Sequence, residues 1–315
     1  MSRLLQLSGA VVDLVYRVEA LPDPGGEAPA SAFAALPGGG FNAMVAARRA
    51  GLAVSYGGGL GSGPFAALVR NGLETEGIPP LRPADPDADQ GSCVVLVDPS
   101  GERSFVSWPG AENHADPGEL ARLPAAAWTL LSGYALCGRD RAALARYAAD
   151  LPRSTRLVFD PAPMVAEIPP AVLYPVLART DWISANLAEA RTITRAEEPG
   201  AAARSLLRLC AHAEGAVLRA GALGCWLAQG RGAGREPAVI HIPAFAVQPI
   251  DTNGAGDTHI GAFIAALAGG ATAPEAARFA NAAAALSTTR QGPATAPDLS
   301  QIREFLASTP TRQTA

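Results

Sequence analysis

The residues best suited to chemistry lie in one short segment, DTNGAGD at positions 251–257, which precedes an apolar stretch with helical spacing. Gly254 and Gly256 allow the backbone to approach a ligand closely, and the first N–H groups of the following helix have no partner inside that helix. Because these groups lie at the positive end of the helix dipole, the backbone of Gly254, Ala255 and Gly256 can bind an anion such as phosphate. The segment therefore predicts an anion hole that needs no lysine.

Asp257 ends this segment, and a carboxylate beside a phosphate site repels the ligand unless it performs a task. The task that fits is to take the proton of an attacking hydroxyl during phosphoryl transfer, a reaction in which the protein mainly positions groups and stabilises charge. The competing interpretation is a plain loop leading into a helix whose first turn carries Asp for capping. A lone G-x-G favours that second interpretation, so the decision depends on support from elsewhere in the chain.

The basic residues add a sharp constraint, because all 25 of them are Arg and none is Lys. This excludes Schiff-base and pyridoxal chemistry, the P-loop, and the strand lysine of protein kinases. The formal charge of −4 provides no long-range attraction for nucleic acid or for a membrane, so we expect a small-molecule partner. Any phosphate must then be bound by backbone amides, arginine or a metal ion.

The four cysteines are far apart in the sequence and form no C-x-x-C pair, so they predict neither a zinc site nor a disulfide framework. The N-terminal apolar run lacks a strongly basic leader and is interrupted by polar residues, which is typical of a first strand rather than a signal peptide. No apolar run reaches the roughly 20 residues that a membrane-spanning helix needs. We therefore expect a cytoplasmic protein with reduced cysteines.

The elements that must position these residues alternate between short β-rich runs and alanine-rich helical stretches. This pattern is typical of an α/β fold with a mostly parallel sheet flanked by helices, and we expect a single domain over residues 1–315. The predicted strands cover residues 4–12, 54–58, 128–132, 156–159, 182–184 and 216–219. The predicted helices cover residues 42–50, 64–76, 139–149, 187–192, 201–213, 255–268 and 274–289.

Two helix-poor excursions interrupt this alternation, at about residues 14–36 and 92–108. The first has short strand-like runs on either side of a stretch rich in Pro and Gly. In the second, residues 93–97 and 103–108 flank DPSG at 98–101, a strong turn signal that predicts a hairpin. Together they predict a small antiparallel sheet, separate from the main one, that either lies over the site as a lid or decorates its edge.

A second glycine motif, GGGFN at residues 38–42, is followed at set distances by Gly51 and Gly61. Together with DTNGAGD at 251–257, it resembles the two motifs of the ribokinase-like, PfkB-type carbohydrate kinases, in the correct order. The resemblance extends from about residue 8 to residue 292 and so covers nearly the whole chain. It implies a ribokinase-like fold with a β lid, ATP as phosphoryl donor, and Mg²⁺.

The resemblance also implies roles for individual residues near the reacting groups. Asp257 would be the catalytic base, and the anion hole would be the backbone of Gly254, Ala255 and Gly256. The residues that would hold the sugar hydroxyls are Asp13, Gly39, Gly40 and Asn42. A carboxylate and an amide suit this task, because they accept from and donate to vicinal diols. Without the resemblance, residues 38–40 are a flexible turn before a helix.

For the nucleotide, Asn186 and Glu189 match the N-x-x-E element of the family. Their spacing puts both side chains on one helix face, where Glu189 would orient water on Mg²⁺ and Asn186 would reach phosphate. The same pair is also a good helix start, with Asn as N-cap and Glu at N3, and both interpretations can hold together. By resemblance, Gly221 and Gly224 lie near the triphosphate, and Asn281 lies on the helix that borders the adenine.

Many relatives bind a monovalent cation beside the anion hole. The resemblance implies that such an ion, K⁺ for example, would lie near Asp251, Asn253 and the backbone carbonyls of residues 290–292. Four positions depart from the family pattern, and they leave the identity of the substrate and part of the nucleotide contact open. These are Met44, Gly63, Arg219 in place of a usual Thr, and His259 in place of a frequent Phe.

The sequence thus predicts an ATP-dependent kinase that phosphorylates a hydroxyl of a small sugar or a nucleoside. The alternative is a non-catalytic sugar- or nucleotide-binding protein on the same fold, which would be expected to lose the base, whereas Asp257 is present. A dinucleotide-binding dehydrogenase needs G-x-G-x-x-G directly after the first strand, and Gly9 is not followed by that pattern. A sheet edge in the lid can pair with a second copy, so a homodimer is a further expectation.

Overall fold

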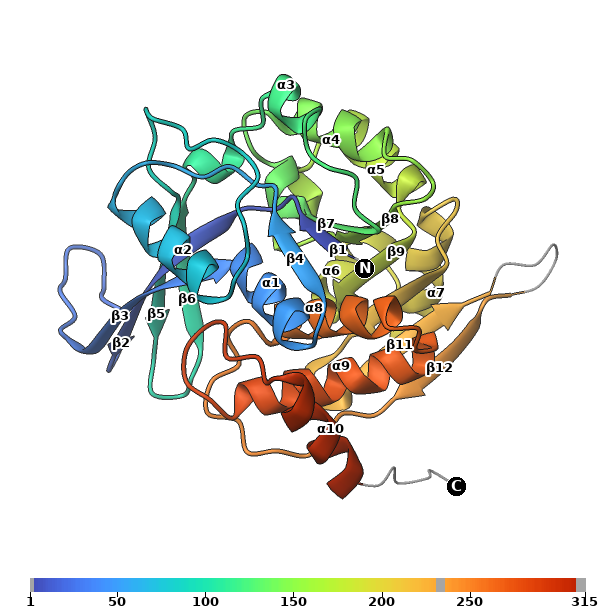
Figure 1. Cartoon of the computed structure of the whole chain (residues 1–315). Helices are drawn as coiled ribbons and strands as arrows, with labels where there is room; N and C mark the ends of the chain where they lie inside the picture. The colour runs from blue at the N-terminus through green and yellow to red at the C-terminus, as the bar shows by residue number, and fades with distance from the viewer. Residues whose placement is uncertain (1–2, 231–235, 310–315) are drawn as a thin grey trace.

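The computed structural model describes residues 3–230 and 236–309, in which the strands form a large and a small sheet (Figure 1). The strands of the large sheet are β1 (Arg3–Gln6), β4 (Ala53–Tyr56), β7 (Trp128–Ser132), β8 (Arg156–Asp160), β9 (Trp182–Asn186), β10 (Gly215–Arg219), β11 (Cys225–Gln229) and β12 (Ala238–Ile242). The strands of the small sheet are β2 (Ala10–Val18), β3 (Ala30–Gly39), β5 (Ser92–Val97) and β6 (Arg103–Trp108).

The large sheet is mostly parallel, as predicted. Its eight strands have the order β12-β11-β10-β9-β8-β7-β1-β4. The strands from β4 to β10 in this order pair in parallel, whereas β11 and β12 complete the other edge as antiparallel strands. Parallel strands with both faces covered have apolar residues at successive positions, which explains the short apolar runs in the sequence.

Helices cover both faces of the large sheet (Figure 1). One face carries α1 (Gly40–Arg49), α2 (Pro64–Thr75), α8 (Ala255–Ala268), α9 (Ala273–Thr288) and α10 (Leu299–Ser308). The other face carries α3 (Pro117–Leu120), α4 (Arg141–Ala149), α5 (Pro170–Arg179), α6 (Leu187–Thr194) and α7 (Pro199–Leu209). Neighbouring strand residues point to opposite faces, so Leu130 of β7 packs in the first core and Leu131 in the second.

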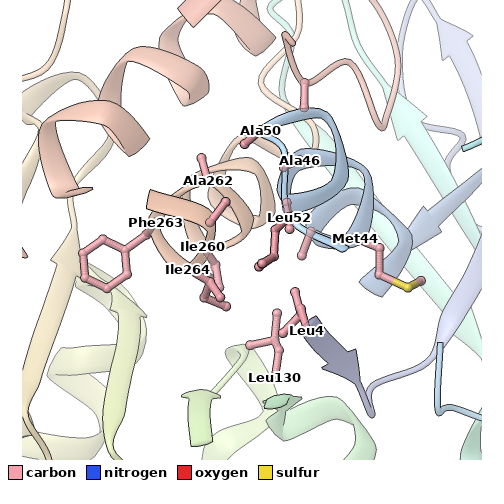
Figure 2. Packing of buried hydrophobic residues seen from close by; sticks show 14 of the residues in the cluster. Leu4, Met44, Ala46, Ala50, Leu52, Leu130, Ile260, Ala262, Phe263 and Ile264 are labelled. Atoms are coloured by element: carbon pink, nitrogen blue, oxygen red, sulfur yellow. The ribbon is translucent and has the colours of Figure 1, made fainter. Parts of the chain in front are cut away.

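Helices α1 and α8 lie side by side on the first face and approach each other through small residues. Figure 2 shows Ala46 of α1 and Ala50, the C-cap of that helix, near Ala262 of α8, with Ile260 and Ile264 directed toward the sheet. Small side chains at a helix crossing bring the two backbones close together, which fixes the spacing of the helices. The two glycine motifs of the sequence lie at the starts of these two helices.

The small sheet is separate from the large one and has the order β3-β2-β5-β6. Its two outer pairs are antiparallel, and its central pair, β2 with β5, is parallel. The predicted strand over residues 4–12 is divided between the two sheets, because the chain leaves β1 at Gln6 and enters β2 at Ala10. Gly9 lies between them, where its carbonyl accepts a hydrogen bond from the Gly40 N–H at 2.9 Å.

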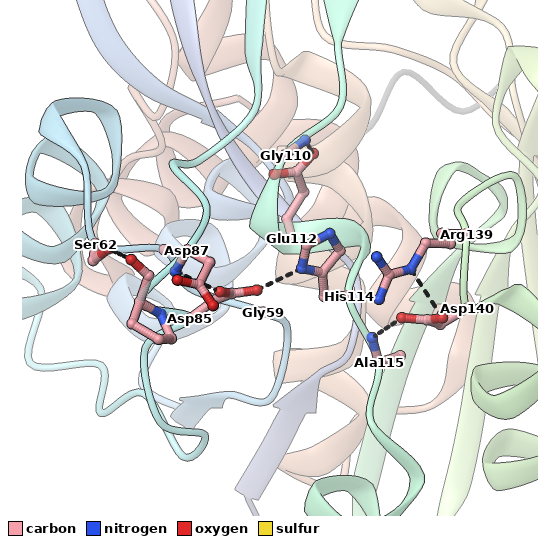
Figure 3. Close-up of polar contacts among 12 residues, drawn as sticks. Gly59, Ser62, Asp85, Asp87, Gly110, Glu112, His114, Ala115, Arg139 and Asp140 are labelled. Carbon is pink, nitrogen blue, oxygen red and sulfur yellow. Dashed lines mark hydrogen bonds and ion pairs between the residues drawn. The ribbon is translucent and has the colours of Figure 1, made fainter.

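Polar contacts fix the connection that leads from β6 back to the large sheet (Figure 3). The Glu112 carboxylate accepts hydrogen bonds from the Gly110 N–H at 2.8 Å and the Gly91 N–H at 2.7 Å. His114 Nδ1 lies 2.6 Å from Asp85 Oδ2, and the Ala115 N–H donates to Asp140 at 3.0 Å. The small sheet is therefore anchored where its strands join the body of the protein.

Candidate active site

The carboxyl ends of three adjacent parallel strands meet the start of α8. Asp160 ends β8, Asn186 ends β9 and Arg219 ends β10. Ligands of open α/β sheets bind outside the carboxyl ends of the strands.

Helix α8 begins at Ala255 as predicted, within the motif at 251–257. Gly254 is its N-cap with φ of 71°, a left-handed conformation that a residue with a side chain seldom adopts. No side chain caps the helix among the residues that the structure describes. The Ala255 N–H donates a hydrogen bond to the Thr252 carbonyl at 3.3 Å. The start of α8 thus has no side-chain cap, and an anion bound there would compete with the Thr252 carbonyl for the Ala255 N–H.

Asp257, the predicted base, lies in the first turn of α8 and is half-buried. Its Oδ2 accepts a hydrogen bond from Asn42 Nδ2 at 3.1 Å, and Asn42 Oδ1 accepts one from the Ala294 N–H at 2.8 Å. The structure brings Asn42 to the predicted base, and its role at the sugar stays a prediction. The two glycine motifs therefore meet through this pair.

Burial raises the pKa of Asp257 to about 6, and the hydrogen bond from Asn42 opposes part of that shift. The negative charge of Asp160 also raises this pKa, and the positive charge of Arg219 lowers it. A carboxylate with a pKa near 6 is ionised at neutral pH and is a stronger base than an exposed one. These are the properties of a general base for an alcohol.

Asp13 of β2 faces the loop before α8. It is buried, and its Oδ2 lies 3.3 Å from Asn253 Nδ2. Burial raises the pKa of Asp13 to about 6, against the effects of the Asn253 hydrogen bond and the nearby charge of Arg103. The structure therefore brings together a predicted sugar ligand and a residue expected near a cation.

Arg103 extends from the small sheet to the loop before α8. Its side chain is half-buried, and its Nη2 donates to Thr252 Oγ1 at 3.0 Å. This hydrogen bond joins β6 of the small sheet to the anion-hole segment. It is consistent with the lid interpretation, which stays a prediction.

The predicted glycines of the first motif lie where β3 passes into α1. Gly39 ends β3 as the N-cap of α1, and Gly40 is the first residue of that helix. The Gly40 N–H is already bonded to the Gly9 carbonyl. In the pairing of β2 with β3, Gly39 lies opposite Ala10 and Asp13 opposite Leu36, and a β-carbon added to Gly38 would overlap the Asp13 carboxylate.

Asn186 and Glu189 form the predicted capping box at the start of α6. Glu189 accepts from the Asn186 backbone N–H at 2.7 Å and from Asn186 Nδ2 at 2.6 Å, while Asn186 Oδ1 accepts from the Glu189 N–H at 2.8 Å. Burial and the neighbouring Asp160 raise the pKa of Glu189 to about 7, and Arg219 opposes this. Asp160, which the sequence interpretation missed, thus belongs to the same group of acids.

Three of the other predicted residues have clear structural partners. Asp251 Oδ1 accepts from the Asn253 N–H at 2.9 Å, and its Oδ2 accepts from the Gly292 N–H at 3.0 Å, which joins the predicted cation loop to the motif. Asn281 is buried and donates to the carbonyls of Ile242 and Pro243 at 3.0 and 3.1 Å. Their roles at a cation and at adenine stay predictions.

His259 is a packed residue in the interior of the protein. Its Nε2 lies 3.1 Å from Asn281 Oδ1, and burial lowers its pKa to about 3, so the ring is neutral at physiological pH. Gly221 and Gly224 have φ values of 55° and 91° and form the turn between β10 and β11. Among the residues that the structure describes, no group of three His, Cys, Asp or Glu side chains is arranged to hold a metal ion.

The comparisons with known proteins agree on one family. A model of the pfkB family carbohydrate kinases matches residues 1–299. The protein named uncharacterized sugar kinase YegV, from Escherichia coli strain K12, is 31% identical over 304 residues, which are 95% of this chain and 92% of that protein. Ribokinase from Haemophilus influenzae is 29% identical over 316 residues, which are 97% of this chain and 99% of that protein.

The fold of this chain is also similar to that of solved ribokinase structures. The structure of Arabidopsis thaliana ribokinase complexed with ribose and ATP has a TM-score of 0.78 at 22% identity, covering 97% of this chain and 98% of that one. No helix in the described residues is long and apolar enough to cross a membrane. With a family model that matches nearly its whole length, the chain belongs to the pfkB family of carbohydrate kinases.

Proposed function

We propose that this kinase transfers the γ-phosphoryl group of ATP to a hydroxyl of a small sugar or a nucleoside, with Asp257 as the base. The observation that carries the proposal is the place of Asp257 in the first turn of α8, beside an uncapped helix N-terminus and bonded to Asn42. A solved relative supports the substrate class, because Arabidopsis ribokinase was determined with ribose and ATP.

In the proposed reaction, Asp257 accepts the proton of the acceptor hydroxyl as the acceptor oxygen forms a bond to the γ-phosphorus. The bond from that phosphorus to the β–γ bridging oxygen breaks, and ADP leaves with its electron pair. The N–H groups of Gly254, Ala255 and Gly256 stabilise the charge on the phosphoryl oxygens. Asn42 holds the carboxylate in place through the 3.1 Å hydrogen bond.

The acceptor would bind between the small sheet and the loop before α8. Asp13 is the principal group there, because its buried carboxylate can accept hydrogen bonds from two neighbouring hydroxyls. Gly39 and Gly40 would let the sugar approach the backbone, and Asn42 would offer its second amide N–H. Arg103 closes this region by its contact with Thr252.

The acids near Arg219 fit a magnesium ion that arrives with ATP. Asp160 and Glu189 are both buried, and burial together with the charge of Asp160 raises the pKa of Glu189, so a cation between the two carboxylates would favour the ionised form of Glu189. Glu189 and Asp160 would hold Mg²⁺ through water, while Asn186, Gly221, Gly224 and Asn281 would contact the nucleotide. When bound, Mg²⁺ supplies charge that neutralises the phosphate oxygens.

We include a monovalent cation in this proposal, with Asp251, Asn253 and the carbonyls of residues 290–292 around it. The support is the hydrogen bond between Gly292 and Asp251, which brings that loop to the anion-hole segment. An ion there would stabilise the loop that also positions Asn42 through Ala294. The measurement is the rate in K⁺ against the rate in tetramethylammonium at equal ionic strength.

The function itself is tested by ADP release with ATP, Mg²⁺ and a panel of pentoses, ketohexoses, phosphosugars and nucleosides. We expect acceptor-dependent ADP release for at least one member and no NAD⁺ reduction in a parallel assay. Tight binding of a sugar by calorimetry without ADP release from any acceptor would favour the non-catalytic binding protein. Release of ADP at the same rate with and without acceptor would indicate an ATPase and contradict the proposal.

The pH dependence provides a further prediction for this reaction. As pH falls through about 6, Asp257 takes up a proton and can no longer accept one, and Asp13 takes up a proton over the same range, so kcat/KM should fall about tenfold or more per pH unit below that value. Asn42, Asp160, Arg219 and Asp13 face this carboxylate and set its pKa together. The profile should be measured over roughly pH 5 to 8 with the acceptor that the panel identifies. A profile that stays flat down to pH 5 would exclude Asp257 as the titrating base.

A further inference from the structure

Arg219 occupies an unusual place for a cation, because it lies against the start of a helix. It ends β10, and a β-carbon added to Gly256 would overlap its Nη1. The guanidinium group is therefore beside the backbone of the predicted anion hole. Its side chain is 11% exposed, so water screens it only slightly.

The partners of Arg219 leave part of its hydrogen-bonding capacity unused. Nη2 lies 3.2 Å from Asp160 Oδ2 and 3.6 Å from Glu189 Oε2. Its Nε is buried and has no hydrogen-bond partner among the residues that the structure describes. An arginine has five N–H donors in a planar fork, and a buried donor without a partner is costly. The ion pairs with Asp160 and Glu189 therefore do not use all the N–H donors of the Arg219 guanidinium group.

The helix dipole makes this arrangement still less favourable in the absence of a ligand. The N-terminus of a helix carries partial positive charge, so cations are favourable at the opposite end and unfavourable here. Arg219 and the N–H groups of Gly256 and its neighbours thus place positive charge on two sides of the same space. An anion between them would accept hydrogen bonds from the Arg219 guanidinium and from the helix N–H groups. Phosphate fits this place, because a planar guanidinium binds it with paired hydrogen bonds.

We propose that Arg219 binds the terminal phosphate of ATP opposite the N-terminus of α8 and stabilises the phosphoryl group as it is transferred. The inference rests on the proposed function and adds a side-chain cation to its backbone anion hole. Arg219 takes no proton and forms no covalent bond. It supplies fixed positive charge in a chain that has no lysine to do so.

A purely structural role is the competing explanation, in which Arg219 only neutralises Asp160 and Glu189. The two roles differ in what they predict for nucleotide binding. If Arg219 binds the terminal phosphate, its loss lowers the affinity for a triphosphate and not the affinity for ADP. If Arg219 only forms a structural ion pair, its loss changes both affinities alike or changes neither.

The test is the affinity of Arg219→Gln for AMP-PNP and for ADP, measured by calorimetry with Mg²⁺ and without acceptor. We expect affinity for AMP-PNP to fall about 10- to 100-fold, from the usual strength of a charged hydrogen bond, with ADP affinity nearly unchanged. Arg219→Lys keeps the charge without the planar fork and should lose less. Arg156→Gln, which removes an exposed ion pair with Glu214, is the matched control and should change neither affinity.

Equal losses for both nucleotides, or no loss for either, would overturn the proposal. If Arg219→Gln does not fold, the affinities for AMP-PNP and ADP are compared instead in Arg219→Lys, or in Arg219→Ala with added guanidinium ion at millimolar concentration.

Measurement of turnover separates this inference from the proposed function. A wild-type protein that phosphorylates an acceptor, with Arg219→Gln equally active and equally tight for AMP-PNP, defeats the role of Arg219 alone. A wild-type protein that phosphorylates no acceptor defeats the proposed function, whatever the binding data show.

Discussion

Replacing Asp257 with Asn is expected to reduce kcat by roughly 10² to 10⁴, the usual contribution of a general base. The substitution keeps the size of the side chain, and an Asn oxygen can still accept the hydrogen bond from Asn42. The start of α8 and the nucleotide contacts should therefore persist. Steady-state turnover with the acceptor found in the panel, together with ADP affinity by calorimetry, measures the two effects separately.

The same substitution should stabilise the protein at neutral pH. The pKa of Asp257 is raised from 3.8 to about 6, so the folded state binds the proton more tightly than the unfolded chain. The cost of the charged carboxylate is absent below pH 4, grows as pH rises from 4 to 6, and is complete above about 6. Because the group is half-buried, we expect a gain of about 1 to 2 kcal/mol above pH 6, or a few degrees in Tm.

Asp298→Asn is the matched control for this prediction. Asp298 is an exposed N-cap of α10, with no hydrogen bond to the site residues that the structure describes, and hydrogen bonds from Ser300 and the Gln301 N–H hold its pKa below the usual value. It should leave kcat unchanged and should not stabilise the protein. Near wild-type kcat in Asp257→Asn would defeat the proposed mechanism, and an equal gain in Tm at pH 4 and pH 8 would defeat the electrostatic explanation.

The structural features of the site that could be predicted are those formed by residues close together in the sequence. Residues 251–257 contain the turn, the helix start and the carboxylate together, so the helix over 255–268 begins and ends as predicted. The capping box of Asn186 and Glu189 has the same local character, because its spacing alone fixes the geometry. Local rules are sufficient where each residue acts on neighbours within one turn.

The position of Asp160 in the site could not be predicted from neighbouring residues in the sequence. Its approach to Arg219 and Glu189 follows from the order β8-β9-β10 in the sheet, which brings three strand ends to one place. The contact between Asn42 and Asp257 likewise joins residues 215 positions apart. An acidic residue at the end of a predicted parallel strand, as in FDP at 159–161, is the signal that could have pointed to Asp160.

Several elements were missed for related reasons. The antiparallel strand β12 forms one edge of the sheet with β11 beside it, and each has only five residues. Helix α5 contains Pro175, a residue that argues against a helix interior, although its apolar face packs in the second core. Tertiary packing overrides the local preference there.

The spacing of α1 and α8 depends on Gly261, and Gly261→Val is expected to have the largest effect on stability. A β-carbon at this position would overlap the backbone carbonyl of Ala43 and would lie 2.9 Å from Ala46 Cβ and from the Ala47 nitrogen. Neither helix can yield locally, because the neighbours are backbone and short side chains in a packed core. We expect a loss of roughly 3 to 4 kcal/mol in the free energy of unfolding, measured by chemical denaturation.

The fraction of Gly261→Val that folds should also be a poorer kinase, because α1 carries Asn42 and α8 carries Asp257. Moving the helices apart lengthens the 3.1 Å hydrogen bond that orients the predicted base, so kcat should fall more than ADP affinity. Gly269→Ala is the matched control at the other end of α8, where the nearest atoms to a β-carbon are 3.4 Å away and φ is −79°. If Gly261→Val loses stability but keeps its kcat, then the distance between the two helices does not govern the base.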